Sequence, residues 1–257
     1  MTIKTKSYFV YGITITSDNR YIDFLEGATA FSAELIPARY TLTTLARELT
    51  RALNSAGEYS YSCSIDRATR KITVHGSGAF TFPVTTAPHL GSSAFSVAGF
   101  TQNKTGTALT SDVGIGLVYY PPRYLQDYLD PQDCISSISE SVNESGDGTV
   151  EVFSLGEKNQ CEFNIDYITN DALKYSSFLE PVENMIEKTR DFLSFLIKKG
   201  PIDFVPDRDN PNFYYTLILE KNSFSSKGTG FRLYEMSGVS HLGLCETKTM
   251  TFRVVNV

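Results

Sequence analysis

Apolar residues recur at three- and four-residue steps in two stretches of the chain, a pattern that predicts two amphipathic helices. The first stretch is residues 42–53, and it ends near the polar segment 54–57. The second predicted helix spans residues 181–199, with Pro181 in its first turn and Gly200 as a left-handed cap after its last turn. The apolar faces of the two helices are formed by Leu42, Leu45, Ala46, Leu49, Ala52 and Leu53, and by Val182, Met185, Ile186, Leu193, Leu196 and Ile197.

Shorter runs of alternating or continuous apolar residues predict β-strands before and after each helix. Residues 21–25 and 31–36 form a predicted strand pair with a turn at residues 26–27. Residues 149–155 and 160–168 form a second predicted pair, a hairpin that turns within the polar segment between them. The remaining predicted strands are residues 59–66, 71–75, 79–84, 114–120, 213–220, 230–235 and 249–255.

Together these elements predict an α+β protein, mostly antiparallel β, with two β-rich domains that each pack one main amphipathic helix on a sheet. Residues 101–111 are rich in Thr, Gly, Asn and Lys, which indicates an exposed loop or a domain boundary. We therefore predict an N-terminal structural domain of β-β-α-β-β type at residues 1–110. The C-terminal β-rich domain is predicted at residues 111–257 and contains the helix at 181–199.

Composition and charge exclude some classes of function. The chain of 257 residues has a net charge of −6, and its basic residues are scattered, with no run longer than two. Because a nucleic-acid-binding protein needs a basic stripe to neutralise phosphates, we expect no direct nucleic-acid binding. No uninterrupted apolar stretch approaches the roughly 20 residues of a membrane-spanning helix. We therefore expect a soluble protein that does not insert into membranes and is not secreted by the usual route.

The spacing of the four cysteines predicts free thiols. Cys63, Cys134, Cys161 and Cys245 lie far apart and form no C-x-x-C pair, so the sequence indicates neither a disulfide framework nor a zinc site. Cys63 and Cys161 fall within alternating strand patterns, where a free cysteine commonly serves as a small apolar side chain. Folding and assembly in a reducing cytoplasm are the expectation.

Residues with catalytic potential form no recognisable motif. The three histidines, His75, His89 and His241, are not close to one another in the sequence. Ser240 and Cys245 flank His241 and suggest a nucleophile, but no third member of a triad can be located from the sequence. We expect these residues to be structural or solvent-exposed, and we predict no catalytic residues and no enzyme activity.

A calcium loop was the other chemical candidate. Asp207 and Asp209 match its first two ligand positions, but Pro211, Asn212 and Ile218 occupy later positions where the loop needs a ligand, a glycine and a bidentate glutamate. Aspartate and asparagine beside proline more often form side-chain-to-backbone turns. We therefore predict a turn at this segment, no metal ion and no cofactor.

Four tyrosines crowd a corner formed by two consecutive prolines, Pro121 and Pro122. Tyrosine is common in interfaces because it buries a large area with little loss of entropy. The tyrosines are therefore candidate subunit contacts, and a small local core is an equally open alternative. These candidates are Tyr119, Tyr120, Tyr124 and Tyr128.

A short strand, a helix rich in Leu and Ala, and a strand pair that turns at Asp-Arg follow one another within about residues 20–100. The key positions of this pattern are residues 22–24, 40–42, 45–46, 52–54, 64–67 and 70–74. It resembles structural proteins of phage tails, and a similar idea appears in hook-associated proteins of flagella. Gly99 and Phe100 correspond to a Leu-Gly-Phe ending of such modules, although Ala98 stands where Leu is usual. The C-terminal helix and sheet, through residues 213–220 and 252–255, are similar to tail-tip and distal-tail proteins of tailed bacteriophages.

The resemblance implies a structural component of a phage tail, a ring-forming distal-tail or tail-tip protein that joins the tail tube to the hub or to fibres. Its partners would be copies of itself, often as a hexamer, and the other tail proteins. Its location would be the virion tail, after assembly in the host cytoplasm. Two alternatives stay open, a receptor- or carbohydrate-binding tail adaptor and, below it, a tail-associated hydrolase.

Overall fold

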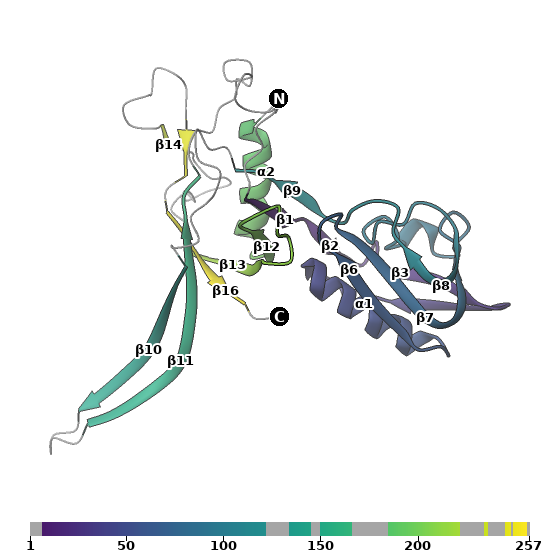
Figure 1. The fold of residues 1–257 in the computed structure, drawn as a ribbon, viewed down its shortest axis with the longest axis horizontal. Helices are drawn as coiled ribbons and strands as arrows, with labels where there is room; N and C mark the ends of the chain where they lie inside the picture. The colour runs from purple at the N-terminus through teal and green to yellow at the C-terminus, as the bar shows by residue number, and fades with distance from the viewer. Residues whose placement is uncertain are drawn as a thin grey trace. The chain divides into compact units, whose positions relative to one another are not determined.

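A computed structural model of the chain describes residues 7–121, 134–144, 150–165, 185–221, 234–235, 245–247 and 249–255. Antiparallel sheets and the two helices α1 (Leu42–Ala56) and α2 (Met185–Ile197) dominate these residues (Figure 1), which confirms the predicted α+β class. The chain divides into two compact units, which we name after their helices. The α1 unit contains Phe9–Tyr119 and Gly200–Tyr214, and the α2 unit contains Tyr120–Lys199 and Tyr215–Asn256.

Helix α1 forms as its sequence pattern predicts. The Thr41 side chain accepts a hydrogen bond from the backbone N–H of Thr44, and the Thr44 hydroxyl accepts one from the backbone N–H of Thr41. This capping box satisfies two N–H groups at the start of the helix. All six predicted apolar positions are buried, and the helix packs against strands of the main sheet of its unit.

The main sheet of the α1 unit has five antiparallel strands. Their order is β4 (Thr29–Glu34), β3 (Tyr21–Glu26), β7 (Lys71–Phe82) and β6 (Tyr61–Asp66), and β8 (Lys104–Thr110) also pairs with β7. Two predictions are wrong here. Residues 71–75 and 79–84 belong to one strand, and the predicted loop at 101–111 contains β8. Strand β8 buries only Leu109, so its edge position leaves almost no apolar pattern in the sequence.

Four short strands of the α1 unit have no counterpart among the predicted elements. Strand β1 (Tyr8–Tyr11) lies between β9 (Leu117–Tyr119) and β12 (Ile202–Val205), and β2 (Ile13–Ile15) pairs with β5 (Ala38–Tyr40). The four unpredicted strands are β1, β2, β5 and β12. Their length of three or four residues is too short to show a period.

An aromatic cluster fills the core of the α1 unit. Neighbouring rings are 5.1 to 5.6 Å apart between centroids and meet mostly edge to face, an arrangement favoured by the ring quadrupoles. The members of the cluster are Phe24, Tyr61, Phe80, Phe82, Phe95 and Phe100.

The α2 unit is built on antiparallel strands in the order β10 (Cys134–Glu144), β11 (Val150–Phe163), β16 (Met250–Val254) and β13 (Tyr215–Lys221). Helix α2 packs against β13. A further pair, β14 (Tyr234–Glu235) with β15 (Cys245–Glu246), is separate from this sheet. The fully buried residues of the helix and sheet are Phe192, Leu193, Leu196, Leu217 and Phe252.

Two details of the predicted second helix are wrong. Ile197 is 37% exposed, because the buried face is set by residues 189, 192, 193 and 196, and Ile197 lies one position off it. The left-handed residue at the helix end is Lys199, with φ of 57°, and not Gly200. Proline at position 201 favours an extended conformation for the residue before it, so the left-handed turn falls one residue earlier.

The predicted hairpin at residues 149–168 is also wrong. Residues 150–163 form the single strand β11, which pairs along its length with β10, and the two make a long ribbon (Figure 1). Ile138 pairs with Glu157 and Glu140 with Ser154, so β11 has one extra residue between these pairs, a β-bulge. The glycine at position 156 falls in this bulge, and its turn-like signal led to the wrong prediction.

Cys161, predicted to be a free thiol, is disulfide-bonded and fully buried in β11. Cys134 lies directly opposite Cys161 in the β10–β11 register. The prediction was wrong because cross-strand neighbours can be far apart in the sequence, and spacing along the chain does not reveal them.

Candidate functional site

The described residues most similar to a catalytic group are Asp23 of β3, Ser32 of β4 and His89, which follows β7. The Asp23 carboxylate lies 2.8 Å from the Nδ1 of His89, accepts a hydrogen bond from the His89 backbone N–H at 2.8 Å, and accepts another from the Ser32 hydroxyl at 2.7 Å. The ring of Tyr21 stacks on the imidazole with centroids 4.3 Å apart. Sequence reasoning named His89 but not its two partners, because β3, β4 and the loop meet only in the fold.

This geometry differs from a Ser-His-Asp triad. In a triad the aspartate and the serine contact opposite nitrogens of the imidazole, so that the histidine can take the serine proton. Here Ser32 Oγ lies 3.2 Å from Nδ1, the same nitrogen that faces Asp23. The serine hydroxyl already donates to the carboxylate. The cluster therefore cannot activate Ser32 through His89.

The cluster instead anchors a loop to the sheet. Burial alone would raise the pKa of Asp23, but hydrogen bonds from the His89 ring, the His89 backbone and Ser32 lower this pKa below its ordinary value. The carboxylate is thus held in its charged form and accepts three hydrogen bonds from two other segments. This is the environment of a structural aspartate.

Other reactive side chains are placed without a partner for chemistry. Burial raises the pKa of the Cys63 thiol to about 11, which leaves very little thiolate, the reactive form. His75 lies 3.0 Å from the Ser64 hydroxyl on exposed strands. His241 and Ser240 lie outside the described residues, and for Cys245 only the backbone is described.

Residues 207–213 form the predicted turn. The Asp207 side chain accepts a hydrogen bond from the backbone N–H of Asp209 at 3.0 Å, and the Asp207 carbonyl accepts one from Asn210 at 3.0 Å. Within the described part of the chain, no group of three or more His, Cys, Asp and Glu residues is arranged to hold a metal ion.

The candidate tyrosines fall into different environments. Tyr119 is 5% exposed and stacks on Phe9, with ring centroids 6.4 Å apart. Tyr120 is 39% exposed, and its ring lies 5.6 Å from that of Tyr8. Tyr124 and Tyr128 lie outside the described residues. Of the two described tyrosines, Tyr120 is the one with surface to offer a partner.

A groove of about 460 Å³ lies between α1 and the chain segment that connects β4 to β5, and we call it the α1 groove. Ile36, Pro37, Arg51 and Ser55 are among the residues that line it. Ile36 is 54% exposed, although it is a large apolar residue. An exposed apolar side chain beside a charged one in a groove is a binding feature, whereas the clusters above are used for folding.

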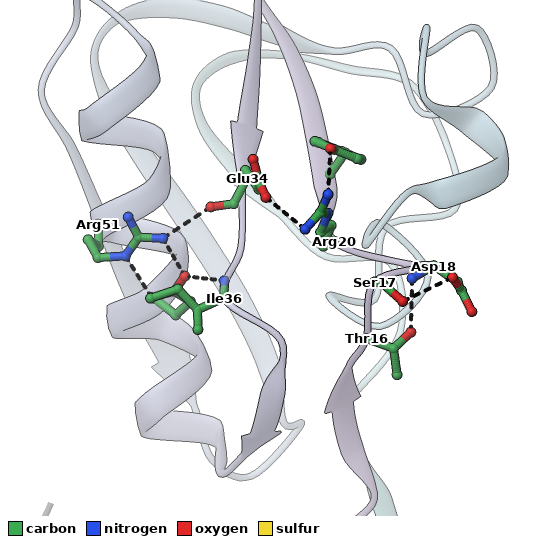
Figure 2. A network of polar contacts seen from close by, with 9 residues as sticks. Thr16, Ser17, Asp18, Arg20, Glu34, Ile36 and Arg51 are labelled. Carbon is green, nitrogen blue, oxygen red and sulfur yellow. Dashed lines mark hydrogen bonds and ion pairs between the residues drawn. The ribbon is translucent and has the colours of Figure 1, made fainter.

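A buried polar network makes the floor of the α1 groove rigid (Figure 2). Glu48 accepts hydrogen bonds from the Ile36 backbone N–H at 2.7 Å and from Arg51 Nε at 2.8 Å, and Arg51 also donates to the backbone carbonyl of Glu34 at 3.0 Å. Burial would raise the pKa of Glu48, but the Arg51 and Ile36 hydrogen bonds lower it, so the carboxylate stays charged. Sequence reasoning missed this pair. Its three-residue spacing on α1 was the available signal.

Comparison of the chain with protein-family models, with curated proteins and with solved structures found no match. In the part of the chain that the structure describes, no helix is long and apolar enough to cross a membrane.

Proposed function

We propose that this chain is a structural component of a phage tail, a ring-forming distal-tail or tail-tip protein that joins the tail tube to the hub or to fibres. The observation that supports this most is where the resemblance lies in the fold. The apolar positions that carry it are packing residues, each with 1% exposure or less. They are Ile22, Phe24, Leu45, Leu53, Ile72 and Val74.

A resemblance carried by core positions concerns the scaffold of the α1 unit and not a reaction centre. The polar groups nearest to these positions serve the same scaffold. Asp23 lies between Ile22 and Phe24 and anchors a loop through three hydrogen bonds. A scaffold of this kind serves a protein whose work is to contact copies of itself and its neighbours.

The partners in this proposal are other copies of the chain, arranged as a closed ring of six, and the adjoining tail proteins. Ring closure favours such an assembly because it leaves no unpaired interface at either end. Strands β10 and β4 each lie at the edge of a sheet, and an exposed edge is a ready surface for association.

Immunogold labelling of purified phage particles from the source of this sequence tests the proposal. The expected result is label at the distal end of the tail and about six copies per particle by quantitative mass spectrometry. Particles that lack the protein, or that carry label only on the capsid, would contradict it.

A further inference from the structure

We infer that the β10–β11 ribbon is an arm through which one copy of the chain binds the α1 groove of a second copy. The inference rests on the proposed function, because it names the element that would join neighbouring subunits. Four observations carry it: the pairing of the ribbon, the residues on one of its faces, its charge and the lining of the groove.

The ribbon extends beyond the sheet that holds its base. Strand β16 pairs with β11 only at residues 160–163, whereas β10 and β11 stay paired as far as Glu144 and Val150. Over the rest of the ribbon, the two strands have no other strand partner among the described residues. A two-stranded ribbon is at best marginally stable alone in water, so a third surface is needed to hold this one.

One face of the distal ribbon combines valines with glutamates. The register places Val142 opposite Val152, and positions two residues away along each strand share their face. Three valines therefore lie on one face, at positions 142, 150 and 152. Glu140 and Glu144 flank Val142 on the same face. Such a face matches a surface that has an apolar centre and a basic rim.

Most of the net charge of the chain belongs to the ribbon. Residues 134–163 contain six acidic residues and one lysine, a net charge of −5, whereas the whole chain carries −6. Residues 7–121, which contain α1 and its sheet, carry eight acidic and eight basic residues and are neutral. The acidic arm is therefore not repelled by the net charge of an α1 unit, while two arms repel each other.

The α1 groove offers the complementary surface. Ile36 and Pro37 supply an apolar centre, with Ile36 54% exposed. Arg47 and Arg51 lie four residues apart on α1, so they are neighbours on the helix surface, and both are exposed. Arg39 is exposed on the adjacent strand β5. The arginines place positive charge around the apolar centre, as the valines and glutamates of the arm require.

An arm and a groove at different places on one chain give a head-to-tail contact, which repeats from copy to copy and closes into a ring. This geometry is why we assign the groove of a second copy, and not that of the same copy, as the binding site.

Charge reversal tests the inference on the full chain. Sedimentation velocity is measured for the wild type, for Glu140→Lys with Glu144→Lys, and for Asp18→Lys with Glu58→Lys. The second pair is a control with the same change in charge at exposed positions of the α1 unit. We expect a multimeric wild type and control, and at least about tenfold weaker association of the arm variant, as for loss of close charge pairs.

A charge swap guards against an effect on folding alone. Arg47→Glu combined with the arm variant should recover association, because the opposite charges then meet again with their signs exchanged. Absence of recovery would contradict the pairing of arm and groove. If the wild type assembles and the arm variant assembles equally well, the arm inference is wrong while the proposed function stands. A monomeric wild type would instead contradict the proposed function itself.

Photocrosslinking locates the contact. A benzoylphenylalanine at Ser154, mixed with isotope-labelled wild-type chain, should give crosslinks between copies that map to residues 36–51. Crosslinks within one copy, or to another region of the second copy, would overturn the assignment of the groove.

Discussion

Buried acidic residues of the α1 unit act as anchors between segments that are distant in the sequence. Glu26 is 7% exposed and accepts hydrogen bonds from the backbone N–H groups of Glu58 and Tyr59 and from the Tyr61 hydroxyl at 2.8 Å. Burial and the nearby Glu26 carboxylate raise the pKa of Tyr61, so its hydroxyl remains a donor. Asp23 and Glu48 make the same kind of connection elsewhere in the unit. At the residue scale, the polar interior is therefore explained by folding.

Asp112 gives a direct test of such an anchor. Its carboxylate accepts hydrogen bonds from the backbone N–H groups of Thr101 and Gln102 and pairs with Lys104 at 2.7 Å. Burial would raise its pKa, but the Lys104 and Thr101 interactions lower it from 3.8 to about 2. Because the folded pKa is the lower one, this stabilisation is present above pH 4 and is lost as the pH falls toward 2.

We expect the Asp112 carboxyl carbon to titrate by NMR with a midpoint of about 2. Replacement by asparagine should flatten the dependence of unfolding free energy on pH in this interval. A midpoint near the ordinary value of 3.8 would show that the interactions with Lys104 and Thr101 do not form in solution.

Gly99 is required by its backbone conformation. Its φ is +77°, and a Cβ there would lie 2.5 Å from the carbonyl oxygen of Val113. We expect Gly99→Ala to lower the free energy of unfolding by about 1–3 kcal/mol in urea denaturation. The matched control is Gly91→Ala, where a Cβ would meet nothing within 4 Å, and it should change stability by less than about 0.5 kcal/mol. Equal effects of the two changes would contradict the assigned conformation.

At the scale of elements, the two helices show which face of each sequence pattern is buried. Leu193 is fully buried, whereas Ile197, one turn further along α2, is 37% exposed. A charge buried without a partner is strongly unfavourable, so Leu193→Asp should unfold or aggregate the α2 unit. Ile197→Asp, the same kind of change on the same helix, should keep a wild-type-like melting curve by circular dichroism. Cooperative wild-type-like melting of the Leu193 variant would show that this helix face is not packed.

The elements that the sequence predicts well are those whose pattern follows from their own burial. Helix α1 buries every predicted apolar position, and β3 and β6 lie within one or two residues of the predicted ranges. Strand β10 was missed because its serines and glutamates alternate with only a few apolar residues, and its pairing partner is known only in the fold. The same is true of the α1 groove, since Glu48 is a charged residue on an otherwise apolar helix face.

At the scale of the whole molecule, the described residues place their reactive groups in structural roles and leave an apolar groove and a long ribbon at the surface. Edges and projecting ribbons expose backbone groups and marginal structure that association can stabilise. A ring of copies would pair arm with groove around a closed circle, with every subunit in the same environment. The proposed tail function and the proposed arm both depend on this association.

The mass of the full-length protein in solution, measured by light scattering over a range of concentrations, tests this association most directly. We expect a species at six times the protomer mass of 28.6 kDa, stable on dilution. A protein that remains at 28.6 kDa at every concentration would contradict a self-assembling tail component.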